Sequence, residues 1–500
     1  MSDMRNWKVF CALFSFLSGS LWGELLLEED NQPLDREQSM PILSYAPTLE
    51  RITPAVVGIT TTEIVAVRAD ADGQSQVEEF LRRFYGLPDD DSEQNAEPDE
   101  APEERRRPGG AGSGVILSRD GYIITNNHVV TNDSGEPVDE VEVLLTDGRT
   151  FIAEIVGADS RTDIAVLKIE ADALPYATIN RSDDLRVGDV VFAIGNPLNV
   201  GLTVTHGIIS ATGRSDLRIL GFGGYEDFIQ TDASINMGNS GGALVDAHGR
   251  LIGINTAILS GSGGNIGIGF AIPISLGLRI AENLIDDGEV SRGFLGVQPD
   301  DLDPVLAESF GLDSAQGAVI TRVTEDSPAL EAGLERGDII LEVGGQIVEN
   351  AADLRLKISF YPPGTPVIFK VFREDETFDV EVNLANLDEA LARMRQGGGF
   401  VAPAEEPEVE LLEGVSFKAV DAEALTELGV VGFVGGLEVL EVDPIGDYGG
   451  KLSPGNIVLE WNGETITSLE TAEAQIIDGV NRLYVWDGQS YRFVGVRVED

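Results

Sequence analysis

Three histidines limit the choice of a catalytic base in this chain. The 500 residues include only His128, His206 and His248. Ser240 lies in the segment Gly-Asn-Ser-Gly-Gly, and Asp163 lies in Thr-Asp-Ile-Ala-Val. A serine hydroxyl becomes a nucleophile at neutral pH when a base takes its proton and a carboxylate orients that base. We therefore predict a catalytic triad of His128, Asp163 and Ser240.

Glycines surround Ser240 and point to a second catalytic requirement. They let the backbone turn so that N–H groups converge on the negative oxygen that develops when a carbonyl is attacked. The loss of one such donor typically costs about 10²–10³ in turnover. The predicted oxyanion hole consists of Gly238 and Ser240, with Asn239 between them.

Each of these residues also has a structural interpretation when it is taken alone. His128 could end a strand, Asp163 could cap a turn beside Thr162, and the glycine-rich run could be an ordinary tight turn. Their joint occurrence in the order His, Asp, Ser favours the catalytic interpretation. His206 and His248 are interpreted as turn residues.

The composition is that of a folded chain with several domains. A chain of 500 residues is longer than an ordinary domain with a single core, so about three domains are expected. Lys and Arg number 34 and Asp and Glu number 86, which gives a formal net charge of −52. A field of this sign repels phosphate backbones, so nucleic acid is not an expected partner. We interpret the acidity as a solubilising surface.

Residues 1–23 are predicted to be a secretory signal peptide. Arg5 and Lys8 precede an uncharged apolar run that ends at Gly23. This run is too short for a comfortable membrane span, so no stable span is expected, and an uncleaved anchor is the alternative. The single cysteine, Cys11, would leave with the signal, so the mature chain would hold no disulfide.

Short β-type segments separated by turn residues predict an all-β barrel or sandwich within residues 41–287. The segment 70–110 differs, because it is rich in charge and proline, and it is predicted to be an acidic mobile loop. Residues 274–287 are predicted to be a helix. The predicted strands include 56–60, 114–117, 122–125, 141–145, 164–169, 190–194, 251–254 and 266–271.

Two further units follow, at residues 292–387 and 409–500, and a Gly/Pro/Glu-rich linker at 397–407 separates them. We call them the first and second repeat. Residues 317–323 and 337–345 of the first repeat match 436–442 and 455–463 of the second. Such duplication predicts two copies of one small α/β module.

Six segments give the chain a resemblance to the HtrA/Deg (protease Do) family, from about residue 47 to 387 and more weakly to the end. They are 125–128 (Thr-Asn-Asn-His), 162–166 (Thr-Asp-Ile-Ala-Val), 193–197 (Ala-Ile-Gly-Asn-Pro), 228–233 (Phe-Ile-Gln-Thr-Asp-Ala), 238–244 (Gly-Asn-Ser-Gly-Gly-Ala-Leu) and 264–273 (Gly-Asn-Ile-Gly-Ile-Gly-Phe-Ala-Ile-Pro).

The resemblance implies a mainly β fold, with a chymotrypsin-like double β-barrel protease domain followed by two PDZ domains. It implies a periplasmic serine endopeptidase that degrades unfolded or damaged envelope proteins without ATP, metal or cofactor and also acts as a chaperone. It further implies homotrimers built near Tyr45 and larger cages. The segment 70–110 falls where the family has its regulatory loop, and 212–227 where it has the loop that senses PDZ occupancy.

The primary specificity pocket is predicted to be small and apolar. Ser234 lies six residues before the nucleophile, so no carboxylate is present where a trypsin-like pocket binds Arg or Lys. Ile235, Ile258 and Ile268 match the positions that line this pocket in the family that the chain resembles. Cleavage is therefore expected after Val, Ala, Ile or Leu. The alternative is that some of these isoleucines, Ile258 in particular, belong to the barrel core.

The first repeat opens with a segment that resembles the PDZ carboxylate-binding turn. Phe294, Leu295, Gly296 and Val297 are the predicted peptide-binding residues, and C-terminal peptides are the predicted ligands. A plain opening strand is the alternative. The corresponding segment 412–417 of the second repeat departs from this pattern. A role in assembly is therefore expected there.

Two other functions remain open at this point. The chain could be a holdase chaperone or a PDZ scaffold in which proteolysis is minor. It could also be a membrane-tethered regulatory protease, although two repeats weigh against that class.

Overall fold

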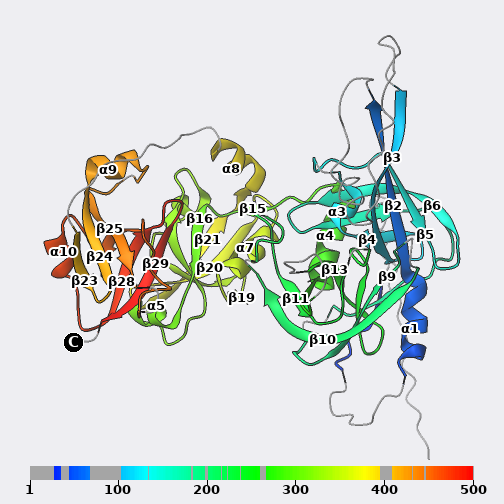
Figure 1. Cartoon of the computed structure of the whole chain (residues 1–500), viewed down its shortest axis with the longest axis horizontal. Coiled ribbons are helices and arrows are strands. Elements are labelled where there is room, and N and C mark those ends of the chain that lie inside the picture. Colours follow the sequence, from blue (N-terminus) through cyan, green and yellow to red (C-terminus); the bar gives the residue numbers. More distant parts are fainter. Residues whose placement is uncertain are drawn as a thin grey trace, which may run out of the picture. The chain divides into compact units, whose positions relative to one another are not determined.

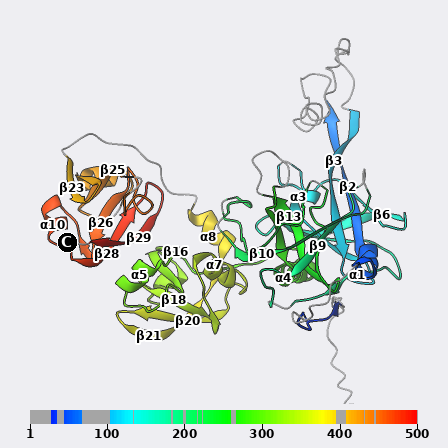
Figure 2. The ribbon, with the colours of Figure 1, turned by 60° about the horizontal axis from the view of Figure 1, so that its bottom comes forward.

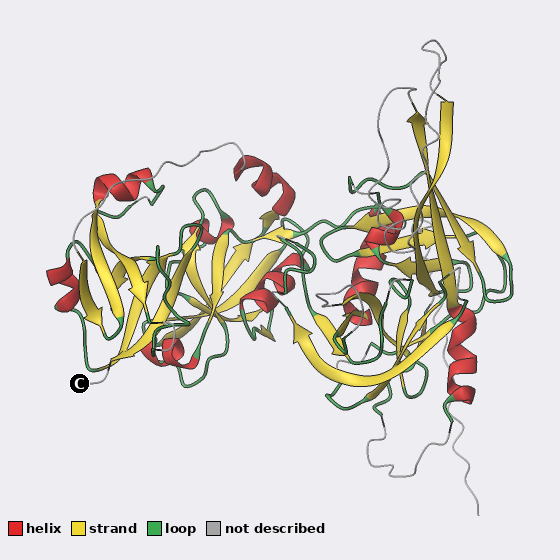
Figure 3. Cartoon of the chain, in the orientation of Figure 1, coloured by secondary structure: helices red, strands yellow, loops and turns green. Residues whose placement is uncertain are grey.

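The computed structural model describes residues 27–34, 44–67, 103–132, 134–181, 184–197, 201–215, 217–221, 223–236, 238–258, 266–394, 408–430, 432–443 and 446–498. The predicted signal peptide and the linker 397–407 lie outside these residues. Contacts divide the chain into two compact units. One comprises residues 1–158, 164–208 and 231–288, and the other comprises 159–163, 209–230 and 289–500. Strands dominate the described chain (Figure 3), which confirms the predicted mainly β fold.

The first barrel is closed by six strands in the order β2-β3-β4-β7-β6-β5 (Figure 1). Its inward-facing side chains are branched and aliphatic, and they form one buried cluster around Ile59, Ile123 and Leu167. The strands are β2 (Val56–Val67), β3 (Glu103–Ile116), β4 (Tyr122–Thr125), β5 (Glu140–Leu144), β6 (Thr150–Asp159) and β7 (Ile164–Lys168).

Strands β2 and β3 continue beyond the barrel as a two-stranded ribbon (Figures 1 and 2). Strand β5 pairs with β2 only as far as Thr62, whereas β3 stays paired with β2 as far as Val67. Residues 103–110 therefore form a strand, and the predicted loop over 70–110 is wrong for them. Their charge and proline content suggested disorder, but the ladder with β2 gives this segment hydrogen-bonded strand partners along one side. Residues 68–102 lie outside the described chain.

The second barrel is closed by the pairing of β13 with β14, in the order β13-β12-β9-β10-β11-β14. Strand β8 (Thr178–Ile179) adds to β13, and β1 (Glu28–Glu29) adds to β8. The closing strands are β9 (Val190–Gly195), β10 (Thr203–Arg214), β11 (Phe228–Thr231), β12 (Ala243–Asp246), β13 (Leu251–Ile258) and β14 (Gly269–Pro273).

The described residues of the barrel region include three α-helices and one 3₁₀ turn. Helix α1 (Ala46–Ile52) and a 3₁₀ turn (Thr53–Ala55) lead into β2, and α3 (Asn127–Val130) follows β4. Helix α4 (Ile274–Asp287) has the predicted bounds and packs on β7 and β13. It ends at Gly288, which adopts φ +76° and donates its N–H to the Leu284 carbonyl, a usual way to terminate a helix.

The first repeat is a sheet in the order β16-β17-β18-β20-β21, with α7 as its longest helix. Strand β16 lies at one edge of this sheet. A separate two-stranded pair joins β15, which precedes this sheet in the chain, to β22, which follows it. The elements are β15 (Gly293–Phe294), β16 (Val297–Asp301), α5 (Pro304–Ser309), β17 (Ala318–Val323), α6 (Pro328–Glu331), β18 (Ile339–Val343), β19 (Gln346–Ile347), α7 (Ala351–Ser359), β20 (Pro366–Arg373), β21 (Glu376–Asn383), β22 (Ala385–Asn386) and α8 (Leu387–Met394).

The second repeat has the same strand arrangement with one strand more, in the order β23-β24-β25-β26-β28-β29. The pair Ala318↔Ile340 corresponds to Leu437↔Val458, so the ladders agree with the duplicated sequence. The elements are β23 (Glu408–Leu412), β24 (Val415–Asp421), α9 (Ala422–Glu427), β25 (Gly435–Val442), β26 (Ile457–Trp461), β27 (Glu464–Thr465), α10 (Leu469–Glu473), β28 (Gly479–Trp486) and β29 (Tyr491–Val498).

The two repeats share a buried contact around Tyr484. Its hydroxyl donates to the Thr321 carbonyl at 2.6 Å, and burial raises the pKa of Tyr484 to about 12. The hydroxyl therefore remains a donor at all ordinary pH values. The Arg336 guanidinium lies 4.3 Å from the ring centroid of Tyr484 and also pairs with Glu460. A cation over an aromatic face contributes more when it is partly desolvated.

Two Asp-Gly hairpins of the first barrel provide a matched test of the packing. A Cβ added at Gly121 (φ +103°) would lie 2.2 Å from the Ile169 carbonyl oxygen, whereas one at Gly148 (φ +89°) would meet nothing within 4 Å. Both alanine variants place a side chain at positive φ, which costs about 1–2 kcal/mol.

We expect Gly148→Ala to lose about that much in the free energy of unfolding, and Gly121→Ala to lose at least about 3 kcal/mol because its backbone must also shift. Urea denaturation followed by circular dichroism measures both. Equal losses would contradict the packing described here.

Candidate active site

The turn around Ser240 is built from glycines that no other residue could replace. Gly238 and Gly241 adopt φ +96° and +79°. A Cβ at Gly241 would lie 2.2 Å from both the Ser113 carbonyl oxygen and Thr125 Oγ1. The Gly241 N–H donates to the Asn255 carbonyl at 2.8 Å. The first barrel and β13 therefore hold this turn from two sides.

The Ser240 side chain is half-buried, and its hydroxyl donates to the Thr256 carbonyl at 3.2 Å. Its own carbonyl accepts from the Ser113 N–H at 2.8 Å. Strand β3 thus fixes the backbone position of the predicted nucleophile.

His128 lies in the short helix α3, directly after β4, and its side chain is exposed. Gly112 lies between this helix and the turn around Ser240. A Cβ there would be 2.7 Å from Val129 Cγ2 and 3.2 Å from the Ser240 carbonyl oxygen. The predicted base and the predicted nucleophile therefore lie on segments that approach the same glycine.

Asp163 is buried and immediately precedes β7. It adopts φ +58°, in the left-handed region that Asp tolerates better than most residues. Ala165 of β7 pairs with Thr125 of β4, three residues before His128. The ladder thus sets the start of β7 beside the end of β4.

The other two histidines have structural contacts. The ring centroid of His206 lies 5.3 Å from that of Phe192 and 6.1 Å from that of Tyr45. His206 belongs to strand β10, so its interpretation as a turn residue is wrong. Continuous pairing of β10 with β9 placed it in a strand. His248 lies in the turn before β13, and its N–H donates to Asp246 Oδ1.

Within the described chain, the N–H groups of Gly238 and Ser240 have no protein acceptor. Asn239 differs, because its N–H donates to the Asn236 carbonyl at 3.0 Å and its side-chain amide donates to the Ser234 carbonyl at 3.3 Å. The two free donors flank a residue whose own hydrogen bonds hold the turn.

The three isoleucines predicted to line the specificity pocket lie on neighbouring segments. Ile235 is buried, and Ile268 is half-buried. Ile258 pairs with Gly269 across β13 and β14. A Cβ at Gly269 would lie 3.0 Å from Ile235 Cδ1, so this glycine leaves room for the Ile235 side chain. The side chain of Ile258 lies outside the described residues.

Comparisons with known proteins agree with this geometry. Residues 112–254 match the family model of a trypsin-like peptidase domain, and residues 293–384 match that of a PDZ domain. The chain is 39% identical over 430 residues to the probable periplasmic serine endoprotease DegP-like of Chlamydia trachomatis serovar D, covering 85% of this chain and 80% of that protein.

It is 42% identical over 346 residues to the periplasmic pH-dependent serine endoprotease DegQ of Escherichia coli K12, covering 69% of this chain and 70% of that protein. A solved structure of the HtrA-type protease AlgW with decapeptide aligns with a TM-score of 0.53 and 44% identity, covering 69% of this chain and 99% of that chain. The chain belongs to the HtrA/Deg family. It is a periplasmic serine endopeptidase with a trypsin-like domain and PDZ domains.

The described part of this HtrA/Deg protein has neither a candidate metal-binding cluster nor a helix suited to span a membrane. No group of three or more His, Cys, Asp or Glu side chains there could hold a metal ion. No helix among the described residues has both the length and the apolar character of a membrane span.

A buried ion pair joins the segment before Asp163 to the start of the first PDZ domain. Arg292 Nη2 donates to Asp159 Oδ2 at 2.6 Å, and the two side chains are 4% and 8% exposed. The same carboxylate oxygen accepts from the N–H of Thr162. The Arg292 guanidinium also lies 5.0 Å from the ring centroid of Tyr225, whose pKa burial raises.

Sequence analysis missed this pair. The sequence offers only a charged residue shortly before each motif. Asp159 lies four residues before Asp163, and Arg292 lies two residues before Phe294. Tyr225 belongs to the segment 212–227, where Glu226 accepts hydrogen bonds from the N–H groups of Leu217, Arg218 and Leu220.

The predicted peptide-binding turn of the first PDZ domain has unsatisfied donors. The carbonyls of Leu295 and Gly296 accept from the N–H groups of Ala329 and Thr324. Their own N–H groups have no protein acceptor in the described chain. Gly296 adopts φ +86°, and a Cβ there would lie 2.2 Å from Ser327 Cβ.

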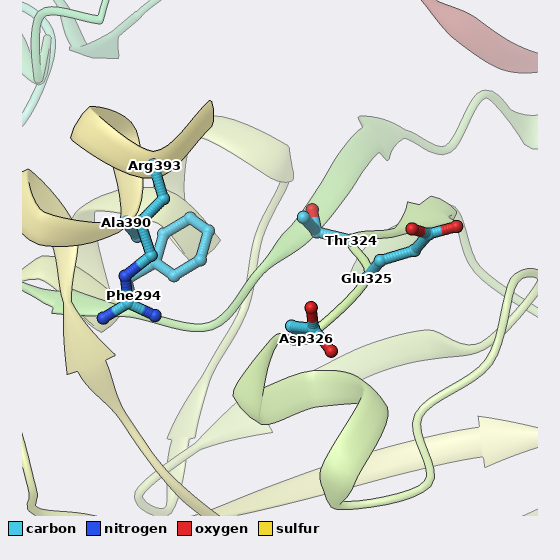
Figure 4. Close-up of a pocket in the computed structure, with 6 residues that line it drawn as sticks. All are labelled: Phe294, Thr324, Glu325, Asp326, Ala390 and Arg393. Carbon is cyan, nitrogen blue, oxygen red and sulfur yellow. The ribbon is translucent and has the colours of Figure 1, made fainter. Parts of the chain in front are cut away.

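A pocket of about 210 Å³ adjoins this turn (Figure 4). Phe294 and Arg393 of α8 lie on one side of it, and Glu325 and Asp326 lie on the other. Thr324 and Ala390 complete the lining. Phe294 therefore faces this pocket, which has walls of opposite charge.

We predict that Asp159→Asn lowers the free energy of unfolding by about 3 kcal/mol, because it leaves the Arg292 charge buried without its carboxylate. Asp388→Asn is the matched control. It breaks the 2.8 Å pair with Arg161, but Asp388 is 67% exposed, so its loss should stay below about 1 kcal/mol. Urea denaturation measures both, and equal losses would contradict the buried role of Asp159.

Proposed function

We propose that His128, Asp163 and Ser240 form the catalytic triad of this endopeptidase. The observation that carries the proposal is the fit of the Ser240 turn against the segment that leads into His128, where Gly241 leaves no room for a side chain beside Thr125. His128 takes the hydroxyl proton of Ser240, and Ser240 Oγ attacks the scissile carbonyl carbon. Asp163 orients the imidazole and stabilises its charged form.

The acyl-enzyme forms when the amine leaves with the proton carried by His128, and water then hydrolyses the ester in the reverse sense. The N–H groups of Gly238 and Ser240 stabilise the oxyanion, and Asn239 holds the turn between them. Attack requires the Ser240 hydroxyl to leave Thr256, to which it donates in this structure.

The proposed substrates are unfolded or damaged envelope proteins, cleaved after Val, Ala, Ile or Leu. The buried side chain of Ile235 beside Gly269 supports a small apolar pocket. Chaperone activity, homotrimers built near Tyr45 and larger cages belong to the same proposal, on the family resemblance. A holdase with minor proteolysis is the competing function.

We propose that the first PDZ domain captures the C-terminus of a peptide. The free N–H groups of Leu295 and Gly296 suit a carboxylate, and the edge strand β16 can pair with an added peptide strand. Phe294 and Val297 flank these donors. The Arg292 pair with Asp159 then connects this turn to the segment that carries Asp163.

The second PDZ domain is proposed to bind no peptide. Its strand β24 pairs with β25 on one edge and with β23 on the other, through Val409↔Phe417 and Leu412↔Val415. Strand β23 thus occupies the edge that corresponds to the open edge of β16. Leu412 is 2% exposed and belongs to the core, which anchors this strand.

We expect Ser240→Ala to reduce cleavage of unfolded casein by at least about 10⁴-fold, because the nucleophile is lost. Mass spectrometry of the wild-type products should show new termini after Val, Ala, Ile or Leu. Unchanged cleavage by the variant would overturn the triad. Suppression of aggregation by the same variant tests the chaperone part separately, and no suppression would remove it.

We expect one C-terminal peptide to bind per chain, and its amidated form to bind at least about tenfold more weakly, because the carboxylate is the group captured. Gly296→Ala should abolish binding. Gly345→Ala, in the same domain, has φ +78° with nothing within 4 Å of the added Cβ and should leave binding intact. Isothermal calorimetry gives affinity and stoichiometry. Two peptides per chain, or equal binding of the amide, would contradict the proposal.

A further inference from the structure

We infer that Ser113 is a positioning residue for catalysis. It belongs to the first barrel and sets the conformation of the turn around Ser240, which carries the two proposed oxyanion donors. It lies on β3, far from Ser240 in the sequence, and is fully buried. Residues 112–116 read as an ordinary buried strand, so nothing in the sequence pattern singles this serine out. The inference rests on the proposed role of Ser240 as the nucleophile.

Each polar atom of Ser113 has a partner at the site. Its hydroxyl donates to the Gly238 carbonyl at 2.6 Å and accepts from the Asn196 N–H at 2.8 Å. Its N–H donates to the Ser240 carbonyl at 2.8 Å, and its carbonyl accepts from Thr125 Oγ1 at 2.7 Å. Because the Asn196 N–H points at the hydroxyl oxygen, the hydroxyl hydrogen is directed at Gly238.

The hydroxyl therefore fixes the peptide group between Gly238 and Asn239. The carbonyl of this peptide accepts from Ser113, and its N–H donates to the Asn236 carbonyl at 3.0 Å. The two proposed oxyanion donors lie on either side of this peptide. The Gly238 N–H belongs to the preceding peptide, so the Ser113 bond holds it through the Gly238 Cα, and a displacement of Gly238 would move this donor away from the developing negative charge.

Glycine makes this external support necessary. Gly238 adopts φ +96°, and glycine visits positive and negative φ with similar ease. The turn therefore cannot hold its catalytic conformation through its own backbone preference. Hydrogen bonds with Ser113 and Asn255 hold it from outside the turn, and the Ser113 hydroxyl makes the one at Gly238.

The loss of the hydroxyl has a predictable consequence. Ser113→Ala would leave the Gly238 carbonyl without its donor and the buried Asn196 N–H without its acceptor, and unpaired buried groups are costly. Both groups can regain partners only if the turn moves. A shift of about 1 Å at a reacting group costs about 10² in rate. Substrate binding in the pocket around Ile235 should change little.

The test compares Ser113→Ala with Ser118→Ala in the mature full chain, using a peptide substrate cleaved after Val. Ser118 is 1% exposed, lies directly beyond β3 and accepts from the Tyr122 N–H at 3.2 Å, but it has no contact with the nucleophile turn. Both variants lose one buried hydroxyl. We expect kcat to fall about 10²-fold for Ser113→Ala with KM within about threefold, and kcat to stay within about twofold for Ser118→Ala.

Equal kcat values for Ser113→Ala and Ser118→Ala would overturn the inference, and so would a loss confined to KM. If Ser113→Ala does not fold, Ser113→Cys takes its place, because its thiol has a similar size and is a weak donor. It should retain the KM and lose about tenfold in kcat, and wild-type kcat would overturn the inference. Ser240→Ala in the same assay separates the two proposals, since activity of that variant would refute the triad itself.

Discussion

The proposed active site depends on a turn whose own backbone preferences do not fix its conformation. Residues 238–242 contain three glycines, and two of them adopt positive φ. The conformation is imposed by hydrogen bonds from Ser113 of β3 and Asn255 of β13, together with the close approach of Gly241 to Thr125. The two barrels of the protease fold therefore fix the conformation of a glycine-rich turn that lies between them. Its branched aliphatic cores supply the rigidity that this requires.

Strand edges determine the difference between the two PDZ domains in a similar way. An edge strand presents free N–H and C=O groups that a peptide can complete. In the first domain this edge, on β16, stays open, and the turn before it leaves the N–H groups of Leu295 and Gly296 free. In the second domain the chain itself fills the edge with β23. One duplicated fold thus has one open strand edge and one covered strand edge.

Much of the architecture could be predicted from the sequence because it depends on local pattern. Short β-type segments between turn residues predicted most barrel strands, and the helix over 274–287 has the predicted bounds. The duplicated segments predicted the matching ladders of the two repeats. Asp120-Gly121 and Asp147-Gly148 mark hairpins, because their glycines adopt the positive φ that such turns require.

The rest depends on contacts between distant segments. Strand β3 begins at Glu103, and only its ladder with β2 explains why so charged a segment is ordered. Asp159 and Arg292 are 133 residues apart, and Ser113 and Gly238 are 125 apart, so neither pair leaves a signal in a local window. Both pairs are identified by the burial of polar side chains, which can be observed only in the folded structure.

The proposed mechanism requires that the fold activates one serine, Ser240. Reaction of the mature protein with a fluorophosphonate, followed by mass spectrometric mapping of the adduct, tests it most directly. A single adduct on Ser240 is expected, because Ser240 is the proposed nucleophile, with His128 as its proposed base and two proposed oxyanion donors beside it. The absence of an adduct, or an adduct on another serine, would contradict it.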